Sequence, residues 1–139
     1  MKLESEKLTA ICDPVDFSHS KKNLEIAHKL IKLMHKEKGM GLAANQCGLE
    51  IRLFVMCVAD RYYHCFNPEI IEHGTENIEL NEGCLSFPGQ VCMISRSKTI
   101  KVRYYSHTGK ETVEQLDGWA ARCFQHELDH LNGLTMFDR

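Results

Sequence analysis

Apolar residues between positions 21 and 38 recur every three or four residues, which is the spacing of one face of an α-helix. The residues on this face are Leu24, Ala27, Leu30, Ile31 and Met34. Gly39 follows directly and is a natural stop for a helix. The pattern therefore predicts an amphipathic helix over about residues 21–38.

The middle of the chain has the patterns of β-strands. Residues 51–58, apolar except for Arg52, form a run of strand length, and apolar side chains alternate in residues 98–105. The full set of candidate strands is 51–58, 62–66, 69–73, 98–105 and 111–116, and the predicted turns are 86–89 and 106–109. A last helix is expected between Asp117 as N-cap and Gly133 as C′ residue. These elements predict a single α+β domain over residues 1–139, with antiparallel strands packed around that helix.

The last helix carries QHELDH at residues 125–130. His126 and His130 are four residues apart, so both imidazoles lie on one face and can reach one metal ion. Glu127 is then placed to handle the proton of a metal-bound water. This H-E-x-x-H pattern is the zinc-peptidase signature and predicts hydrolysis of an amide. The alternative is an amphipathic helix whose histidines are merely polar or satisfied by packing.

A catalytic metal site needs three protein ligands and one open position. Too few residues follow His130 to supply a glutamate from a later helix, and Met136 stands where the extended zinc motif has a third histidine. The third ligand is therefore expected upstream, and Cys84 in EGCLS (residues 82–86) is the best candidate. A thiolate with two imidazoles suits Zn²⁺, Fe²⁺, Co²⁺ or Ni²⁺. A buried structural thiol is the alternative.

The run GMGLAANQ at residues 39–46 is rich in glycine and alanine, so its backbone is expected to pass close to another group. Gln46 ends the run with a side-chain amide that can donate to a carbonyl. The run lacks the spacing of a phosphate-binding loop. An ordinary helix-to-strand connection is the alternative.

Together these segments resemble the peptide deformylases, a family in which a GxGLAAxQ loop, an EGCLS segment and a QHExDH helix recur in this order. This sequence has them at residues 39–46, 82–86 and 125–130 without a mismatch. It also has the family's Asn-Pro pair, at residues 67–68. The resemblance covers roughly residues 24–139, whereas the first twenty residues match poorly.

The resemblance implies a metal-dependent hydrolase that removes the N-formyl group from formyl-methionyl peptides or nascent proteins and releases formate. In that mechanism a metal-bound water attacks the formyl carbon, with Glu127 as general base and then general acid. The amide of Gln46 and the backbone N–H of Leu85 would stabilise the oxygen that becomes negatively charged. The implied metal ligands are Cys84, His126 and His130. Fe²⁺ is the favoured ion, and Zn²⁺, Ni²⁺ or Co²⁺ can also fill such a site.

Substrate binding also follows from the resemblance. The peptide would lie along the glycine loop and the EGCLS segment, bound by backbone groups of Gly41, Gly83 and Leu85. The methionine side chain would enter an apolar pocket beside the metal-binding helix. The residues expected to line this pocket are Met40, Leu80, Trp119 and Cys123. For each of the four, plain core packing is an equally weighted alternative.

The sequence departs from the family in two ways. Ile94-Ser95-Arg96 replaces the usual Val-Pro-Arg, and the apolar Val91 stands where some bacterial members have a basic residue. Longer bacterial members continue into another helix that is implicated in ribosome docking, whereas this sequence stops at Arg139. Ribosome contact through such a helix is therefore not expected. The short form resembles phage-encoded members, which would act in an infected bacterium.

Composition narrows the functional classes. The net charge of −2, with no basic block, gives no sign of a nucleic-acid partner. No apolar run reaches the roughly 18 residues of a membrane span and no signal peptide opens the sequence, so a cytoplasmic protein is predicted. The odd number of cysteines, seven, without a C-x-x-C pair, indicates reduced thiols. Two rival functions stay open: an endopeptidase with an unusual cysteine ligand, and a non-catalytic metal-binding module.

Overall fold

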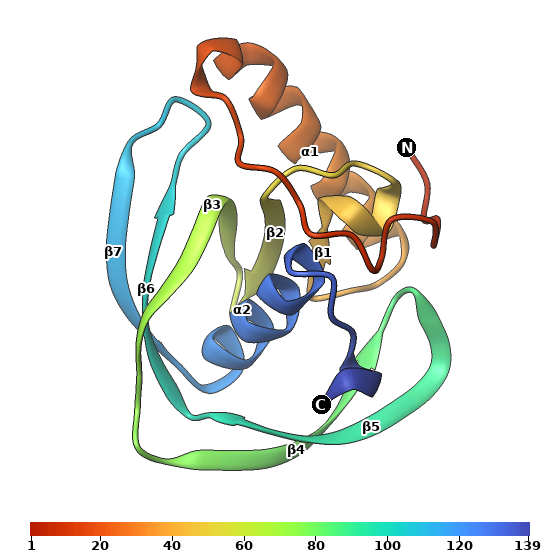
Figure 1. Ribbon diagram of the computed structural model, residues 1–139, viewed down its shortest axis with the longest axis vertical. Coiled ribbons are helices and arrows are strands. Elements are labelled where there is room, and N and C mark those ends of the chain that lie inside the picture. The colour runs from red at the N-terminus through yellow and green to blue at the C-terminus, as the bar shows by residue number, and fades with distance from the viewer.

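The structure, a computed structural model, describes all residues from Met1 to Arg139 and confirms the α+β architecture (Figure 1). Two α-helices, α1 (Ser20–Lys36) and α2 (Gly118–Leu131), accompany seven strands. The strands are β1 (Gly41–Ala43), β2 (Leu53–Val58), β3 (Arg61–His73), β4 (Asn77–Cys84), β5 (Phe87–Ser97), β6 (Thr99–Tyr105) and β7 (Glu111–Asp117). Three short 3₁₀ helices are η1 (Phe17–His19), η2 (Ala44–Cys47) and η3 (Met136–Asp138). Neither α-helix combines the length and the apolar character that crossing a bilayer requires.

The strands form two separate antiparallel sheets. One sheet has five strands in the order β1-β2-β3-β6-β7, whereas β4 and β5 pair only with each other as a hairpin. Helix α1 packs against β1 and β2, and helix α2 contacts β1, β2, β6 and β7 as well as β5 of the hairpin. Figure 1 shows α2 in the middle of the molecule, with strands on several sides. This is the central helix that the sequence predicts.

Strand β2 coincides with the continuous part, residues 53–58, of the apolar run predicted at residues 51–58. Phe54 and Met56 belong to the hydrophobic cluster that includes residues of α2, whereas Leu53 and Val55 belong to the cluster that includes residues of α1. Because both faces of the strand are buried, the alternation of apolar and polar residues is lost. The ring of Phe54 packs edge to face on Phe124 of α2, with the ring centroids 5.0 Å apart. This contact fixes α2 against the sheet.

The predicted division between residues 62–66 and 69–73 is wrong, because both stretches belong to the single strand β3. Between them the pairing of β3 with β6 shifts register, and Asn67 there adopts a φ of 46°. Asparagine tolerates this left-handed backbone better than most residues. The Asn67 side chain accepts a hydrogen bond from the Val15 amide (2.7 Å) and donates one to the Val15 carbonyl (3.3 Å). The irregularity thus attaches the N-terminal segment to the sheet.

Hydrophobic patterning gives little sign of the hairpin formed by β4 and β5. Most of its residues are exposed or half-buried, so there is little alternation to detect. The turn is also narrower than the predicted residues 86–89. Only residues 85–86 form it, because Phe87 already pairs with Cys84 at the start of β5.

Helix α2 begins and ends near the predicted positions. Asp117 is the N-cap residue, although its side chain makes no capping hydrogen bond. Gly133, with a φ of 77°, takes the left-handed conformation expected of a C′ residue, and its amide donates to the His130 carbonyl at 3.0 Å. Helix α1 ends at Lys36, slightly before the predicted end, and Lys38 adopts a left-handed φ of 58°.

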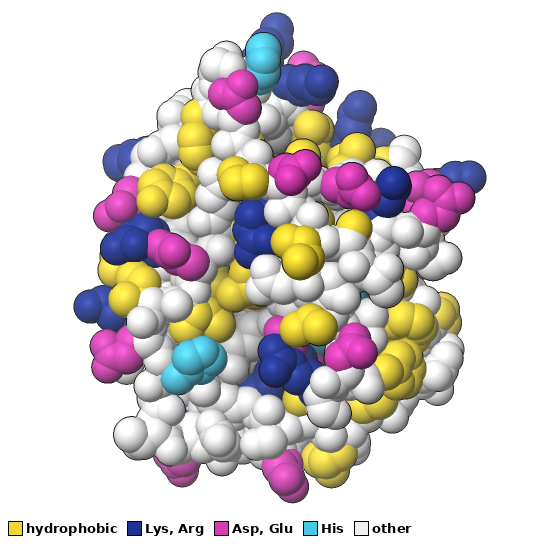
Figure 2. All heavy atoms as spheres, viewed as in Figure 1, with side chains coloured by type: hydrophobic (Ala, Val, Ile, Leu, Met, Phe, Trp, Pro, Cys, Tyr) yellow, Lys and Arg dark blue, Asp and Glu magenta, His cyan; other side chains and the backbone are white.

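Charged side chains are mixed on the surface. On the face drawn in Figure 2, basic and acidic groups are interspersed and do not gather into an area of one sign. This distribution agrees with the small net charge of −2. It provides no extended field on this face that would attract a polyanion.

Candidate metal centre and active site

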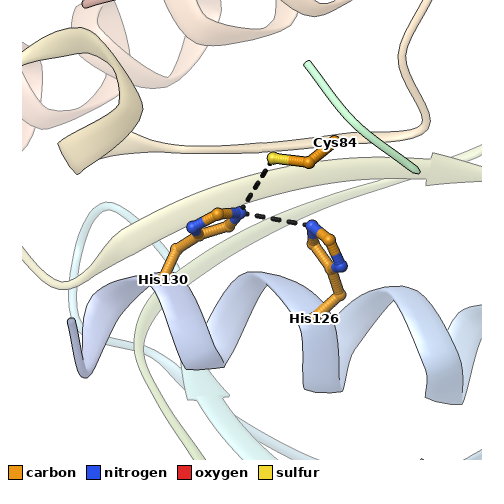
Figure 3. A group of neighbouring side chains, drawn as sticks. All are labelled: Cys84, His126 and His130. Atoms are coloured by element: carbon orange, nitrogen blue, oxygen red, sulfur yellow. Dashed lines mark hydrogen bonds between the residues drawn. The ribbon is translucent and has the colours of Figure 1, made fainter. Parts of the chain in front are cut away.

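Two predicted metal ligands lie on α2 and the third at the end of β4. The Nε2 atoms of His126 and His130 are 3.2 Å apart, and the Sγ of Cys84 is 3.4 Å from the Nε2 of His130 (Figure 3). One ligand atom from each residue lies within 4.8 Å of the other two. The structure thus brings together a thiol and two imidazoles that are far apart in the sequence.

The donor set fits a divalent cation. A thiolate and two imidazoles suit Zn²⁺, Fe²⁺, Co²⁺ or Ni²⁺. The Nδ1 of His126 is hydrogen-bonded to Oε1 of Glu82 at 2.7 Å, which leaves its Nε2 directed toward His130. Metal-binding histidines ordinarily have such a partner on the second ring nitrogen. Nδ1 of His130, in contrast, is buried and has no hydrogen-bond partner.

The two histidines differ in their affinity for protons. Burial and the neighbouring His126 lower the pKa of His130 to about 3, so its imidazole is neutral and has a free electron pair. Burial acts in the same direction on His126, but the nearby Cys84 thiol and the hydrogen bond to Glu82 outweigh it and raise its pKa to about 10. A cation bound here would therefore displace a proton from His126.

Glu82 lies at the centre of a buried network of charges. It accepts hydrogen bonds from Arg96 at 2.5 and 2.9 Å, from Nη1 of Arg122, and from His126. Burial would raise the pKa of Glu82, but the bonds from His126 and Arg96 lower it to about 2. Arg96 also donates to Asp129 of α2 at 2.9 Å. The hairpin is thereby attached to α2 beside the candidate ligands.

Glu127 is buried, and its Oε1 atom has no hydrogen-bond partner. Burial is the main reason that its pKa is raised to about 7. Room for the side chain depends on Gly41 of β1, where a Cβ atom would lie 2.8 Å from both Oε2 of Glu127 and Sγ of Cys123. A carboxylate with these properties can exchange a proton near neutral pH.

The amide of Gln46 has a fixed orientation. Its Oε1 accepts a hydrogen bond from the backbone N–H of Ala43 at 2.9 Å. Its Nε2 lies 3.0 Å from Oγ of Ser86 and 3.5 Å from Sγ of Cys84. The donor end therefore faces the end of β4. The neighbouring Asn45 donates from its side chain to the carbonyl of His130, which links η2 to α2.

A cleft of about 590 Å³ opens beside these groups. It is lined by most of the predicted substrate-binding residues, namely Met40, Gly41, Gly83, Leu85, Trp119 and Cys123. Leu80 is not among the lining residues, because β4 contributes to the cleft from Asn81 onward. The lining also includes the buried Arg122, which the sequence analysis did not place there.

Sequence reasoning missed the residues that support the candidate ligands. Chief among these are Glu82, Arg96 and Asp129, all buried and all polar. Glu82 precedes Cys84 by two residues, which places both side chains on one face of an extended strand. Since a metal-binding histidine needs an acceptor for its second nitrogen, this spacing was an available signal.

Comparisons with known proteins agree with this geometry. The sequence profile of the family described as "Polypeptide deformylase" matches residues 1–139. A peptide deformylase of Thermotoga sp. (strain RQ2) is 47% identical over 119 residues, which is 86% of this chain and 71% of that protein.

Solved structures are similar over almost the whole chain. The crystal structure of peptide deformylase from Thermotoga maritima has a TM-score of 0.93 and 41% identity, covering 99% of this chain and 95% of that one. The PDF from the Vibrio parahaemolyticus bacteriophage VP16T, solved in complex with actinonin, has a TM-score of 0.89 and 32% identity. That comparison covers 97% of this chain and 99% of the phage chain.

Proposed function

Since the chain belongs to the polypeptide deformylase family, we propose that it is a metal-dependent enzyme that releases formate from formyl-methionyl peptides or nascent proteins. The observation that carries the proposal is the convergence of Cys84, His126 and His130 beside the buried, unpaired carboxylate of Glu127. The mixed thiol and imidazole set supports a divalent metal ion at this point.

Cys84, His126 and His130 would hold the ion. When bound there, a divalent cation supplies Lewis acidity and brings the pKa of a coordinated water toward about 7. Glu82 keeps the His126 ring in one tautomer by accepting the hydrogen bond from Nδ1. Cys84, His126 and His130 would thus each direct one electron pair toward the ion.

Glu127 would move the proton. Its unpaired Oε1 is the acceptor for a proton released by the attacking water, and the same carboxyl group would then donate to the leaving amine. Burial favours the neutral carboxylic acid, which raises the pKa of Glu127 to about 7. A group with this pKa can both accept and donate at neutral pH.

Gln46 and Leu85 would stabilise the negative charge that develops on the formyl oxygen. The Gln46 amide is held by Ala43 so that Nε2 faces the end of β4, and the backbone N–H of Leu85 follows Cys84 directly. Because such donors are in place before the reaction, no free energy is spent on reorienting them. Removal of one such donor typically lowers the rate about 10²–10³-fold.

The substrate would lie in the cleft beside α2. We assign peptide binding to backbone groups of Gly41, Gly83 and Leu85. The methionine side chain would contact Met40, Trp119 and Cys123, which line the cleft. Trp119 and Met40 are 53% and 42% exposed, so both have surface to lose on substrate binding.

The decisive experiment measures formate release from formyl-Met-Ala-Ser by anaerobically purified protein, with metal analysis of the same sample. We expect Glu127→Ala to keep its metal and lose about 10²–10⁴-fold in kcat. We expect Cys84→Ser to lose metal and activity together. Undiminished formate release by Glu127→Ala would exclude the proposed acid and base. Cleavage of internal bonds in an unblocked peptide would favour the endopeptidase instead.

The ion is proposed on the chemistry of the donor set and on the family resemblance. Fe²⁺ or Ni²⁺ protein is expected to turn over faster than Zn²⁺ protein prepared from the same metal-free batch. Equal or faster turnover with Zn²⁺ in these matched samples would contradict the assignment.

A further inference from the structure

Asp129 lies next to His130 on α2, but its side chain is bound by two arginines. Its Oδ2 accepts from Nη1 of Arg96 at 2.9 Å and from Nε of Arg139 at 3.0 Å. Its Oδ1 accepts from Nη2 of Arg139 at 2.5 Å. Arg139 thus binds both oxygens of this carboxylate, and Arg96 shares one of them.

From Arg96 the network continues to the candidate metal ligand. Arg96 holds both oxygens of Glu82, and Glu82 accepts the Nδ1 hydrogen bond of His126. An unbroken series of charge-assisted hydrogen bonds therefore connects Arg139 with the His126 ring. Such bonds are shorter and stronger than neutral ones, and they influence one another in a low-dielectric interior.

Arg139 is by far the most exposed member of this series. The side chains of Arg96, Glu82 and Asp129 are 4%, 5% and 9% exposed, against 45% for Arg139. Arg96, Asp129 and Arg139 line a polar cleft of about 500 Å³ that lies on a different face of α2 from the substrate cleft. Arg139 can therefore be changed without touching the candidate active site.

Removal of the Arg139 guanidinium would leave Oδ1 of Asp129 without its partner. A buried carboxylate that loses a hydrogen-bond partner is destabilised, so Asp129 would turn toward water to regain one. That movement would weaken its bond to Arg96. Arg96 would then hold Glu82 less rigidly, and the ring of His126 would lose part of its fixed orientation.

We propose that Arg139 is a positioning residue for the metal centre, acting on His126 through Asp129, Arg96 and Glu82. This inference rests on the proposed function, because it requires that His126 binds a metal ion. The effect differs from general stabilisation in that it changes the rate of metal release. Charge alone does not suffice, because Arg139 uses two nitrogen atoms to hold one carboxylate.

The test measures Ni²⁺ release from the loaded, full-length protein into a chromophoric chelator. Loss of the direct hydrogen-bond partner of a metal-binding histidine typically lowers metal affinity about 10–100-fold. Because Arg139 acts through three intermediate side chains, Arg139→Ala is expected to accelerate release by about 3–10-fold. Arg139→Lys should restore part of the difference, since it supplies the charge without the two-nitrogen geometry.

The matched control is Arg103→Ala. Arg103 pairs with Glu69 and Glu111 on the exposed side of β6 and is 36% exposed, but no series of bonds connects it to α2. Its loss should leave Ni²⁺ release unchanged. Unfolding temperatures of the metal-free proteins, measured in parallel, separate a change in the metal centre from a general loss of stability.

A double-mutant cycle tests the route. If Arg139 acts through Asp129, adding Arg139→Ala to Asp129→Asn should not accelerate release further. Release at the parental rate from Arg139→Ala, equal acceleration by Arg103→Ala, or additive effects in the cycle would each overturn the role of Arg139. A parent protein that retains no Ni²⁺ would overturn the metal site as well, so the two failures are distinguishable.

Discussion

Glu82 and His126 are joined by a hydrogen bond of 2.7 Å between Oε1 and Nδ1, and both side chains are at least nine-tenths buried. When His126 gives up a proton to bind a metal ion, this bond would keep the remaining proton on Nδ1, and Nε2 already faces His130. Glu82 is held in turn by Arg96 and Arg122. The orientation of a candidate metal ligand therefore depends on a carboxylate from the hairpin.

Replacement of this carboxylate by an amide should weaken metal binding. Glu82→Gln keeps an oxygen acceptor but removes the charge that Arg96 and Arg122 both contact. We expect affinity for Ni²⁺ to fall about 10–100-fold, as measured by competition with a chelator of known affinity. Glu79→Gln, an exposed change on the same strand, is the control. Unchanged affinity in Glu82→Gln would contradict this role of the pair.

We predict that Gly41 is essential for activity because its neighbours leave no room for a side chain at this position. A Cβ atom at this position would lie 2.8 Å from Oε2 of Glu127 and Sγ of Cys123. Gly41→Ala should displace Glu127, lower kcat/KM at least about tenfold and cost about 1–3 kcal/mol of stability through overpacking. Metal content should be unchanged, because the candidate ligands are not touched. Formate release and thermal unfolding of the same preparation would check both effects.

A second glycine provides the comparison for the stability effect. A Cβ at Gly83 would meet nothing closer than the Gln90 carbonyl oxygen at 3.8 Å, which is ordinary contact. Gly83→Ala should therefore unfold at nearly the parental temperature. If it loses as much stability as Gly41→Ala, crowding at Glu127 is not the cause.

Asn67 is expected to contribute to stability in two ways. Its side chain makes two hydrogen bonds to Val15, and its backbone has a positive φ of 46°. Asn67→Ala loses both bonds and places a Cβ-bearing residue without a local hydrogen bond in the left-handed region, at a cost of about 2–3 kcal/mol. Asn67→Gly should recover the backbone part. Urea unfolding of the parent and the two variants separates the side-chain and backbone contributions. Equal losses of unfolding free energy in Asn67→Ala and Asn67→Gly would exclude the backbone contribution.

Glu114 should make stability depend on pH in the acid range. Burial would raise its pKa, but hydrogen bonds from Arg61 and Tyr104 outweigh burial and hold the pKa below its ordinary value of 4.5. Because the folded state binds this proton less readily than the unfolded state, the stabilisation is present above pH 4.5. It disappears as the pH falls through the folded-state pKa.

The corresponding experiment compares unfolding of the parent and Glu114→Gln across pH. At pH 7 the variant should be less stable by about 0.5–1 kcal/mol, since the pair with Arg61 is partly exposed. The difference should shrink as the solution is acidified. A difference that stays constant down to low pH would exclude the ionised carboxylate as its source.

Local patterns predicted the parts of the fold in which burial is regular. The apolar run of β2 and the periodicity of α1 both reflect cores that the structure contains. The spacing of His126 and His130 and the placement of Cys84 could also be read from sequence, because short motifs with a chemical role have fixed spacing. The structure places all three side chains together.

The remaining features depend on tertiary contacts. The hairpin of β4 and β5 is held by Arg96 and Arg122 and has little apolar alternation, so hydrophobic patterning gives no strong signal. Leu80 was expected in the substrate pocket, yet the lining of the cleft begins one residue later. Arg122 was not expected there, because a buried arginine can be recognised only when its partner Glu82 is known.

The separation of the hairpin from the five-stranded sheet has a consequence for how activity is lost. A two-stranded hairpin alone is at best marginally stable, so its persistence depends on its attachment to α2 and η3. Transient detachment of this segment would withdraw Cys84, Leu85 and Glu82 at once while the larger core stays folded. Inactivation on warming would then precede global denaturation, and amide hydrogen exchange in β4 and β5 would report it first.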